Sequence, residues 1–250
     1  MAVTDFLAPL AFGPAGWGDE LLSGAWLTLR LALATAPIGF AIGLGVALMR
    51  NARSRPLRAL GEGYGAVFRA LPELLTIFIV YFGAPRLINA LLALGEGALG
   101  LPPSARQFQI DGFTAGVTAL ALVLGAFSSE VFLGAMRSVP SGQREAADAL
   151  GMSRAQTFRL VVLPQTLRLA GPGLANNLMT LLKDTSLVSV VALPELMRQA
   201  NLAALGTRQP FLIYLVACLL YLAMSWLSER LRARLESGPG LNRLARDGGR

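Results

Sequence analysis

The stretch Gln209–Ser228, "QPFLIYLVACLLYLAMSWLS", contains no charged residue and lies between Arg208 and Glu229. A helix needs about 20 mostly apolar residues to cross the hydrocarbon core of a bilayer. The rest of the chain has the same character, because 54% of its 250 residues are hydrophobic and only 15% are charged. Its mean hydropathy is +0.55. This composition predicts an all-α integral membrane protein and argues against a soluble domain.

Four other stretches are apolar enough to form similar helices. In the first of them Gly39, Gly43 and Gly45 predict close helix packing, and Gly39 and Gly43 have the spacing of a small-residue motif. We predict about five spans, at roughly 21–49, 60–92, 112–136, 167–193 and 209–228. They form one transmembrane domain over residues 21–236, after the N-terminal segment 1–20 and before a disordered tail, 237–250.

The basic residues are distributed unequally between the predicted loops. The chain has 22 lysines and arginines, Lys183 being the only lysine, and its net charge is +7. Most of the arginines fall in loops 50–58 and 137–168 or after residue 229. Because Lys and Arg are retained on the cytoplasmic side, we predict that these loops and the C-terminus are cytoplasmic and that the N-terminal segment is periplasmic.

Several chemistries are excluded by what the chain lacks. It has no histidine and a single cysteine, Cys218, so His-based catalysis, His-ligated metals and intrachain disulfides are ruled out. A P-loop requires Gly-Lys followed by Ser or Thr, whereas the only lysine is followed by Asp184. We therefore predict no metal and no ATP site in this chain.

The loop segment Glu145–Pro164, "EAADALGMSRAQTFRLVVLP", is too charged to cross a bilayer. Its local chemistry predicts an elbow of two short helices over residues 141–158. The signals are Ser141 as an N-cap, Gly151 as a C′ stop, Ser153 and Gln156 as a capping box, and Pro164 as the end of the second helix.

Three stretches together resemble the permease subunits of ABC importers. The EAA loop of that family reads Glu-Ala-Ala, three residues, Gly, nine residues, an aliphatic residue, any residue, then Leu-Pro. It is matched in register by Glu145, Ala146, Ala147, Gly151, Val161, Leu163 and Pro164. The stretches "FRALPELLTIFIVYFG" (68–83) and "LLKDTSLVSVV" (181–191) resemble span signatures of the polar amino-acid branch. The resemblance covers 21–236 and is most similar to permeases for histidine, arginine and opines such as octopine.

The resemblance implies a permease subunit, not an enzyme, in the bacterial inner membrane. It implies transport of polar amino acids, including basic ones, or of opine-like derivatives. The chain itself would hold no cofactor, since ATP and Mg would be bound by partner ABC ATPase subunits. The other implied partners are a second permease subunit, a periplasmic solute-binding protein and membrane lipid, with no nucleic acid. The residues that would couple to the ATPase are Glu145, Ala146, Ala147, Gly151, Leu163 and Pro164.

Ionisable residues at membrane depth are costly and are functional candidates. Arg69 and Glu73 are four residues apart, which predicts a structural ion pair on one helix face. Glu130 is expected to pair with a neighbouring arginine in a structural role. Lys183 and Asp184 lie in the middle of the fourth predicted span, where they either contact solute or form a structural pair between two subunits.

The same span offers a set of polar side chains for a solute. The stretch "GPGLANN" (171–177) is expected to loosen the helix, and irregular backbone is tolerated where it lines a cavity. Position 187, one turn from Lys183, is leucine, so no second acid is apparent for a basic solute. The candidate pathway residues are Asn176, Asn177, Lys183, Asp184, Thr185 and Ser186.

Two other classes of function are compatible with these residues. An ion-coupled secondary transporter would use Asp184 or Glu130 as a proton relay and would need no ATPase. A membrane-embedded enzyme would depend on a Ser–Lys arrangement around Lys183. The sequence leaves open which solute is carried and whether the second permease subunit is a copy of this chain or a homologue.

Overall fold

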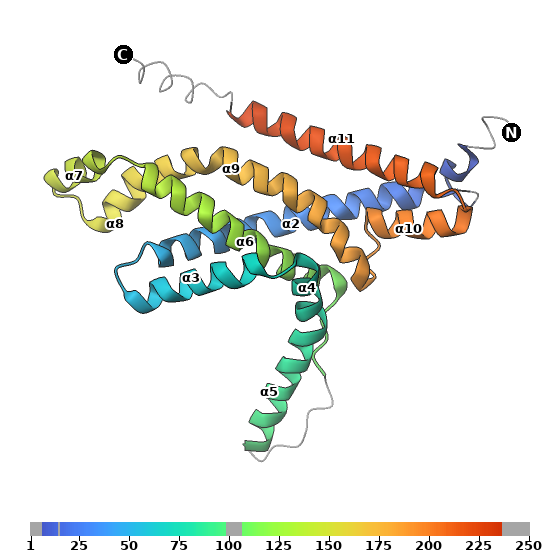
Figure 1. Ribbon diagram of the computed structural model, residues 1–250, viewed down its shortest axis with the longest axis horizontal. Coiled ribbons are helices and arrows are strands. Elements are labelled where there is room, and N and C mark those ends of the chain that lie inside the picture. The colour runs from blue at the N-terminus through green and yellow to red at the C-terminus, as the bar shows by residue number, and fades with distance from the viewer. Residues whose placement is uncertain (1–6, 15, 99–106, 237–250) are drawn as a thin grey trace. The chain divides into compact units, whose positions relative to one another are not determined.

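The computed structural model describes residues 7–14, 16–98 and 107–236, and all regular structure in these ranges is helical (Figure 1). The predicted all-α class is therefore confirmed. The chain separates into two compact units, one made of Met1–Leu29 with Pro194–Arg250 and the other of Arg30–Leu193. The tail that was expected to be disordered, 237–250, lies outside the described residues.

Four helical segments in the described part of the chain are long and apolar enough to cross a membrane. They are α2 (Gly18–Arg50), the segment Glu73–Ala98, α6 (Gly112–Ser138) and the apolar part of α11 (Pro210–Glu236). The helix α9 (Leu163–Asp184) is not one of them, because glutamine, asparagine and proline residues lower its hydropathy. Beyond α9, the 3₁₀-helix η4 covers Thr185–Val191. That this fourth stretch crosses the membrane stays a prediction.

The predicted span 60–92 is divided at Pro72. The amphipathic helix α3 (Arg55–Ala70) ends before Leu71, its C-cap, where the backbone is extended with ψ of 136°. Pro72 has the same ψ of 136°. The steric demand of a proline disfavours helical backbone in the residue before it, which explains the break. The segment resumes with α4 (Glu73–Phe78), a π-helical turn η2 (Ile79–Gly83) and α5 (Ala84–Ala98). The apolar segment therefore begins at Glu73 and α3 is a separate element.

The larger unit is organised around α6, which packs against α3, α4 and α9. Figure 1 shows α6 and α9 side by side along much of their length. The glycines of α2 allow close contact with α6, because a Cβ at Gly39 would lie 2.5 Å from Leu124 Cδ2 and one at Gly43 would lie 2.8 Å from Ser128 Cβ. The close packing predicted for Gly39 and Gly43 is confirmed, whereas the prediction for Gly45 was wrong, because a Cβ there would meet nothing within 4 Å. α6 consequently forms the buried wall against which other elements place their side chains.

The smaller unit contains the start of α2, the 3₁₀ turn η1 (Ala8–Leu10), α10 (Leu196–Thr207) and α11, with α10 packed on α11. Glu195 is fully buried and caps α10, its carboxylate accepting hydrogen bonds from the N–H groups of Met197 (2.9 Å) and Arg198 (2.7 Å). The hydroxyls of Thr28 and Tyr221 donate to the same carboxylate at 3.4 and 3.3 Å. Glu195 therefore joins α2, α10 and α11 through hydrogen bonds. It was not among the residues predicted from the sequence.

Candidate functional site

The elbow consists of two short helices, α7 (Ser141–Ala149) and α8 (Arg154–Thr157), as predicted. Between them Gly151 adopts a left-handed conformation with φ of 74°. The N–H of Met152 donates to the carbonyl of Ala147 at 3.1 Å, and the N–H of Gly151 donates to that of Asp148 at 3.0 Å. This pair of bonds is a Schellman motif, so the turn after α7 is fixed by the backbone itself.

The start of α8 has the predicted capping box. The Ser153 hydroxyl accepts from the N–H of Gln156, and the Gln156 side chain accepts from the N–H of Ser153 at 2.8 Å. The prediction for Ser141 was wrong: it is the first helical residue of α7, and Pro140 occupies the N-cap without a side-chain bond. Proline has a fixed φ, so Pro140 marks the start of α7 through its backbone conformation and not through a side-chain hydrogen bond.

The prediction that Pro164 ends the second helix was also wrong. From α8 the chain continues through a π-helical turn, η3 (Phe158–Val162), directly into α9. Pro164 lies in the first turn of α9, where a missing N–H costs little, and the π-helical turn before it changes the hydrogen-bond register. The helical rod is therefore unbroken from Arg154 to Asp184. The stretch 171–177 does not loosen it, since Pro172 lies inside α9.

The predicted coupling residues divide into two groups by position. On α7, Glu145 and Ala146 are exposed while Ala147 is buried, and the neighbouring Leu150 is 82% exposed. The surface of the elbow therefore includes the carboxylate of Glu145 and the exposed apolar side chain of Leu150. Gly151 lies in the exposed turn between α7 and α8. Leu163 and Pro164 are the first two residues of α9.

A second feature of the larger unit is a cavity of about 250 Å³ between α4, α6 and α9. Its polar lining comes from Glu73 on α4 and from α9, namely Asn176, Asn177, Thr180 and Asp184. Its apolar lining consists of Leu120, Val123, Leu124, Phe127 and Leu181. We call this cavity the two-acid pocket, because carboxylates from two elements far apart in the sequence line it.

The two-acid pocket contains half of the predicted pathway residues. Asn176, Asn177 and Asp184 line it, and the Asn177 amide donates to the Ser128 hydroxyl at 3.3 Å. The other three predicted residues do not line it. Lys183 is exposed, the Thr185 hydroxyl donates to the Leu182 carbonyl at 2.7 Å, and the Ser186 hydroxyl donates to the Lys183 carbonyl at 2.7 Å.

Two further residues line the pocket, Glu73 and Thr180, and neither was predicted as a pathway residue. Glu73 is the second acid that appeared to be absent, and it comes from α4 instead of from a neighbouring turn of α9. It was assigned to an ion pair with Arg69, and the break at Pro72 removes the continuous helix on which that pairing rested. The pocket suits an elongated solute that ends in a cationic group. It offers two carboxylates, two amides and a hydroxyl beside an apolar wall.

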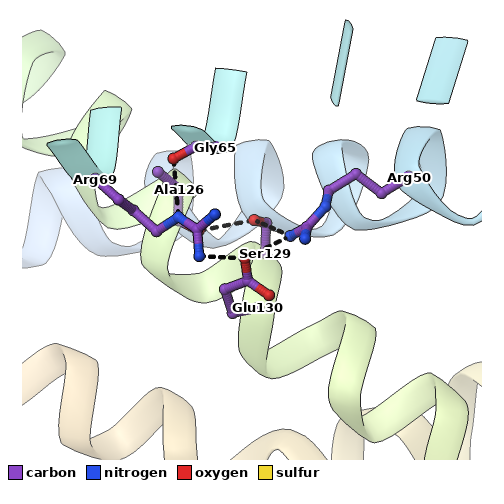
Figure 2. Close-up of polar contacts among 6 residues, drawn as sticks. All are labelled: Arg50, Gly65, Arg69, Ala126, Ser129 and Glu130. Carbon is purple, nitrogen blue, oxygen red and sulfur yellow. Dashed lines mark hydrogen bonds and ion pairs between the residues drawn. The ribbon is translucent and has the colours of Figure 1, made fainter. Parts of the chain in front are cut away.

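Arg69 pairs with Glu130 instead of Glu73, as Figure 2 shows. The same carboxylate oxygen of Glu130 is 2.8 Å from a guanidinium nitrogen of Arg50, and the Ser129 hydroxyl accepts from Arg50 at 3.5 Å. The Arg69 Nε donates to the Gly65 carbonyl at 2.8 Å. This three-residue cluster of Arg50, Arg69 and Glu130 joins the ends of α2 and α3 to the middle of α6.

Two other expectations can be compared with the described residues. Lys183 and Asp184 do not approach within ion-pair distance of each other in the described chain, and their pairing between two subunits stays a prediction. No group of three His, Cys, Asp or Glu side chains in the described ranges is arranged to hold a metal ion.

Residues 39–238 match a family described as the binding-protein-dependent transport system inner membrane component. Among curated proteins, the chain is 40% identical to the nopaline transport system permease protein NocQ of Agrobacterium fabrum, over 90% of this chain and 92% of the relative. It is 35% identical to the arginine ABC transporter permease protein ArtQ of Escherichia coli, over 86% of this chain and 93% of the relative.

Solved structures give the same result. A crystal structure of an amino acid ABC transporter with histidines matches with a TM-score of 0.72 and 30% identity, covering 88% of this chain and 94% of the other. The inward-facing MetNI methionine ABC transporter matches with a TM-score of 0.62 at 18% identity, which shows likeness of fold alone. These neighbours are ABC transporters, so they do not support the alternative of an ion-coupled secondary transporter.

Proposed function

Because the chain belongs to the family of binding-protein-dependent transport system inner membrane components, we propose that it forms the pathway for a cationic amino acid or an opine-like derivative. The chain is a permease subunit of an ABC importer in the inner membrane, and it performs no chemistry itself. The observation that carries the choice of solute is the two-acid pocket, with Glu73 and Asp184 on facing elements.

The pocket chemistry favours a guanidinium or ammonium group. A cation that leaves water needs charged acceptors, and hydrogen bonds to charged groups contribute about 1.5–3 kcal/mol each. Glu73 and Asp184 supply such acceptors, while Asn176 and Asn177 supply amide donors for the carboxylate of an amino acid. Phe127, 41% exposed, and the buried Leu120 would pack against the aliphatic part of the solute. The names of the permeases for arginine and for nopaline accord with this choice.

The elbow and the pocket are connected by one helix. α9 has 22 residues from Leu163 to Asp184, and at 1.5 Å per residue it spans about 33 Å. Movement of α7 and α8 by an ATPase would be passed along this rod to Asp184, which ends it and lines the pocket. The arginine distribution supports a cytoplasmic position for the elbow, where separate ATPase subunits would bind it. A periplasmic binding protein would deliver solute to the opposite side, and a second permease subunit would complete the assembly.

The pocket is tested by ATP-dependent uptake of labelled arginine into proteoliposomes containing the assembled importer. Glu73→Gln and Asp184→Asn each remove a carboxylate while keeping side-chain size, and each is expected to lower uptake by roughly 10-fold or more. Lys183→Gln is the matched control, because Lys183 is exposed and does not line the pocket. Equal uptake by all three variants would contradict the assignment of the pocket, and uptake without ATP would contradict the transport class.

The elbow is tested by co-purification. Glu145→Arg reverses the charge of an exposed residue on α7, and we expect the purified permease to lose its ATPase subunits. Glu62→Arg on α3 makes the same change at another exposed acid and should leave the ATPase bound. If both variants retain the ATPase at the level of the unmodified chain, the elbow is not the docking surface.

A further inference from the structure

A second cavity lies where α2 and α6 end beside the elbow, with a volume of about 340 Å³. Three arginines from three separate segments line it: Arg53 follows α2, Arg144 is on α7 and Arg154 begins α8. Among the described lining residues, Asp148 is the only acid. We call this cavity the three-arginine pocket. It is distinct from the two-acid pocket, with which it shares no lining residue.

The arginines of this pocket have no carboxylate partner. Glu130 forms ion pairs with Arg50 and Arg69, and no ion pair of Arg53, Arg144 or Arg154 is found among the described residues. One guanidinium nitrogen of Arg144 donates to the Met136 carbonyl at 3.0 Å. Its Nε, however, is shielded from solvent and has no acceptor. Three positive charges therefore line one cavity with a single acid, and a buried donor there is unsatisfied, an arrangement that an anion would stabilise.

We propose that the three-arginine pocket binds a phosphoryl group. Arginine forms bidentate hydrogen bonds with phosphate oxygens, and three guanidinium groups can surround one such group. The pocket lies at the ends of two apolar helices that border the elbow. With the orientation predicted from the arginines, this end of the helices would lie at the lipid headgroups of the cytoplasmic leaflet. Basic pockets between helices on this side of a membrane suit anionic phospholipid headgroups. A bound phosphoryl group would link Arg53 to Arg144 and Arg154, and would hold the elbow against the ends of the spans.

The experiment measures ligand binding to the purified importer complex by native mass spectrometry in detergent. The probes are phosphatidylglycerol, phosphatidylcholine and inorganic phosphate, applied separately. The double variant Arg53→Gln/Arg154→Gln removes two exposed pocket arginines. Arg159→Gln/Arg168→Gln removes the same charge from exposed positions on η3 and α9 that do not line the pocket.

Phosphatidylglycerol is expected to bind more tightly than phosphatidylcholine. At roughly fivefold per arginine, the pocket variant should weaken its binding by about 25-fold, and the control variant should weaken it by less than about fivefold. Binding of inorganic phosphate with the same dependence on the variants, without a lipid preference, would assign the phosphoryl group to a soluble source. Equal losses in the two variants would overturn the proposal. Loss of ATPase subunits from the pocket variant, with unchanged phosphoryl binding, would overturn it too and make the arginines a protein contact.

Discussion

Neutralising Glu130 should destabilise the three-residue cluster more than removing either arginine partner. Glu130 pairs with both Arg50 and Arg69, so Glu130→Gln loses two ion pairs and leaves two positive charges facing each other. Arg69→Gln loses one pair and also removes the repulsion between the two arginines. Glu130→Gln removes the charge and keeps the size of the side chain, whereas Arg69→Gln removes one charge and also shortens the side chain.

The magnitude follows from the exposure of the three side chains. Arg50 is 14% exposed and Glu130 37% exposed, so we assign this pair about 1.5 kcal/mol, at the lower end for a charged hydrogen bond. Arg69 is 34% exposed, and its pair is discounted to about 0.5 kcal/mol, within the range of surface ion pairs. Glu130→Gln should therefore cost about 2 kcal/mol, which lowers Tm by about 4–8 °C for a chain of this length.

The assay is thermal unfolding of the purified complex followed by circular dichroism. Arg69→Gln should lower Tm by no more than about 2 °C. In the background of Glu130→Gln, the further change Arg69→Gln should be neutral or stabilising, because it removes an unpaired positive charge. Glu62→Gln on α3 is the control, an exposed acid without an ion pair. If Glu130→Gln lowers Tm no more than Arg69→Gln does, the two ion pairs of Glu130 do not stabilise the fold as their geometry indicates.

Three further predictions concern single turns and caps. Gly151→Ala places a Cβ in open space at φ of 74°, so it should cost about 1 kcal/mol through the backbone alone, measured as a fall in Tm. Hydrogen bonds from the Thr114 hydroxyl and from backbone N–H groups lower the pKa of the Asp111 carboxyl below its usual 3.8. Its stabilising effect on α6 should be present above about pH 4 and be lost as the pH falls through that lowered pKa, whereas Asp111→Asn should flatten acid unfolding curves over that range. Glu195→Ala removes the cap of α10 and leaves the buried Thr28 hydroxyl without its acceptor, which should cost about 3 kcal/mol, while Glu195→Gln should cost less.

The helices that the sequence predicts most closely are those whose boundaries are set by local composition. α2, α6 and α11 each contain a long run with few charges. The bounds of α2 and α6 and the start of α11 fall near the predicted ones, while α11 continues beyond the predicted end at 228 to Glu236. Gly151 was predicted correctly for the same reason, because a left-handed residue at C′ is a local requirement. Signals that act within one or two turns of the chain can be read without knowledge of the fold.

The residues that were misassigned depend on distant neighbours. Arg69 and Glu73 have the spacing of a helical ion pair, yet a carboxylate on α6 binds Arg69 and a break at Pro72 separates the two helices. Glu73 is thereby available to the two-acid pocket, whose other acid is more than 100 residues away in the sequence. Glu195 shows the same limit, because its role as a shared acceptor appears only when α2, α10 and α11 are placed together.

The measurement that tests the central claim most directly compares two ligands of nearly equal shape. Equilibrium binding of labelled arginine and of citrulline, its uncharged isostere, would be measured on the purified permease–ATPase complex without a binding protein. If Glu73 and Asp184 hold the cationic end of the solute, arginine should bind roughly 10- to 100-fold more tightly, and Glu73→Gln should remove most of that preference. Equal binding of the two ligands, or a preference that survives loss of both carboxylates, would contradict the account.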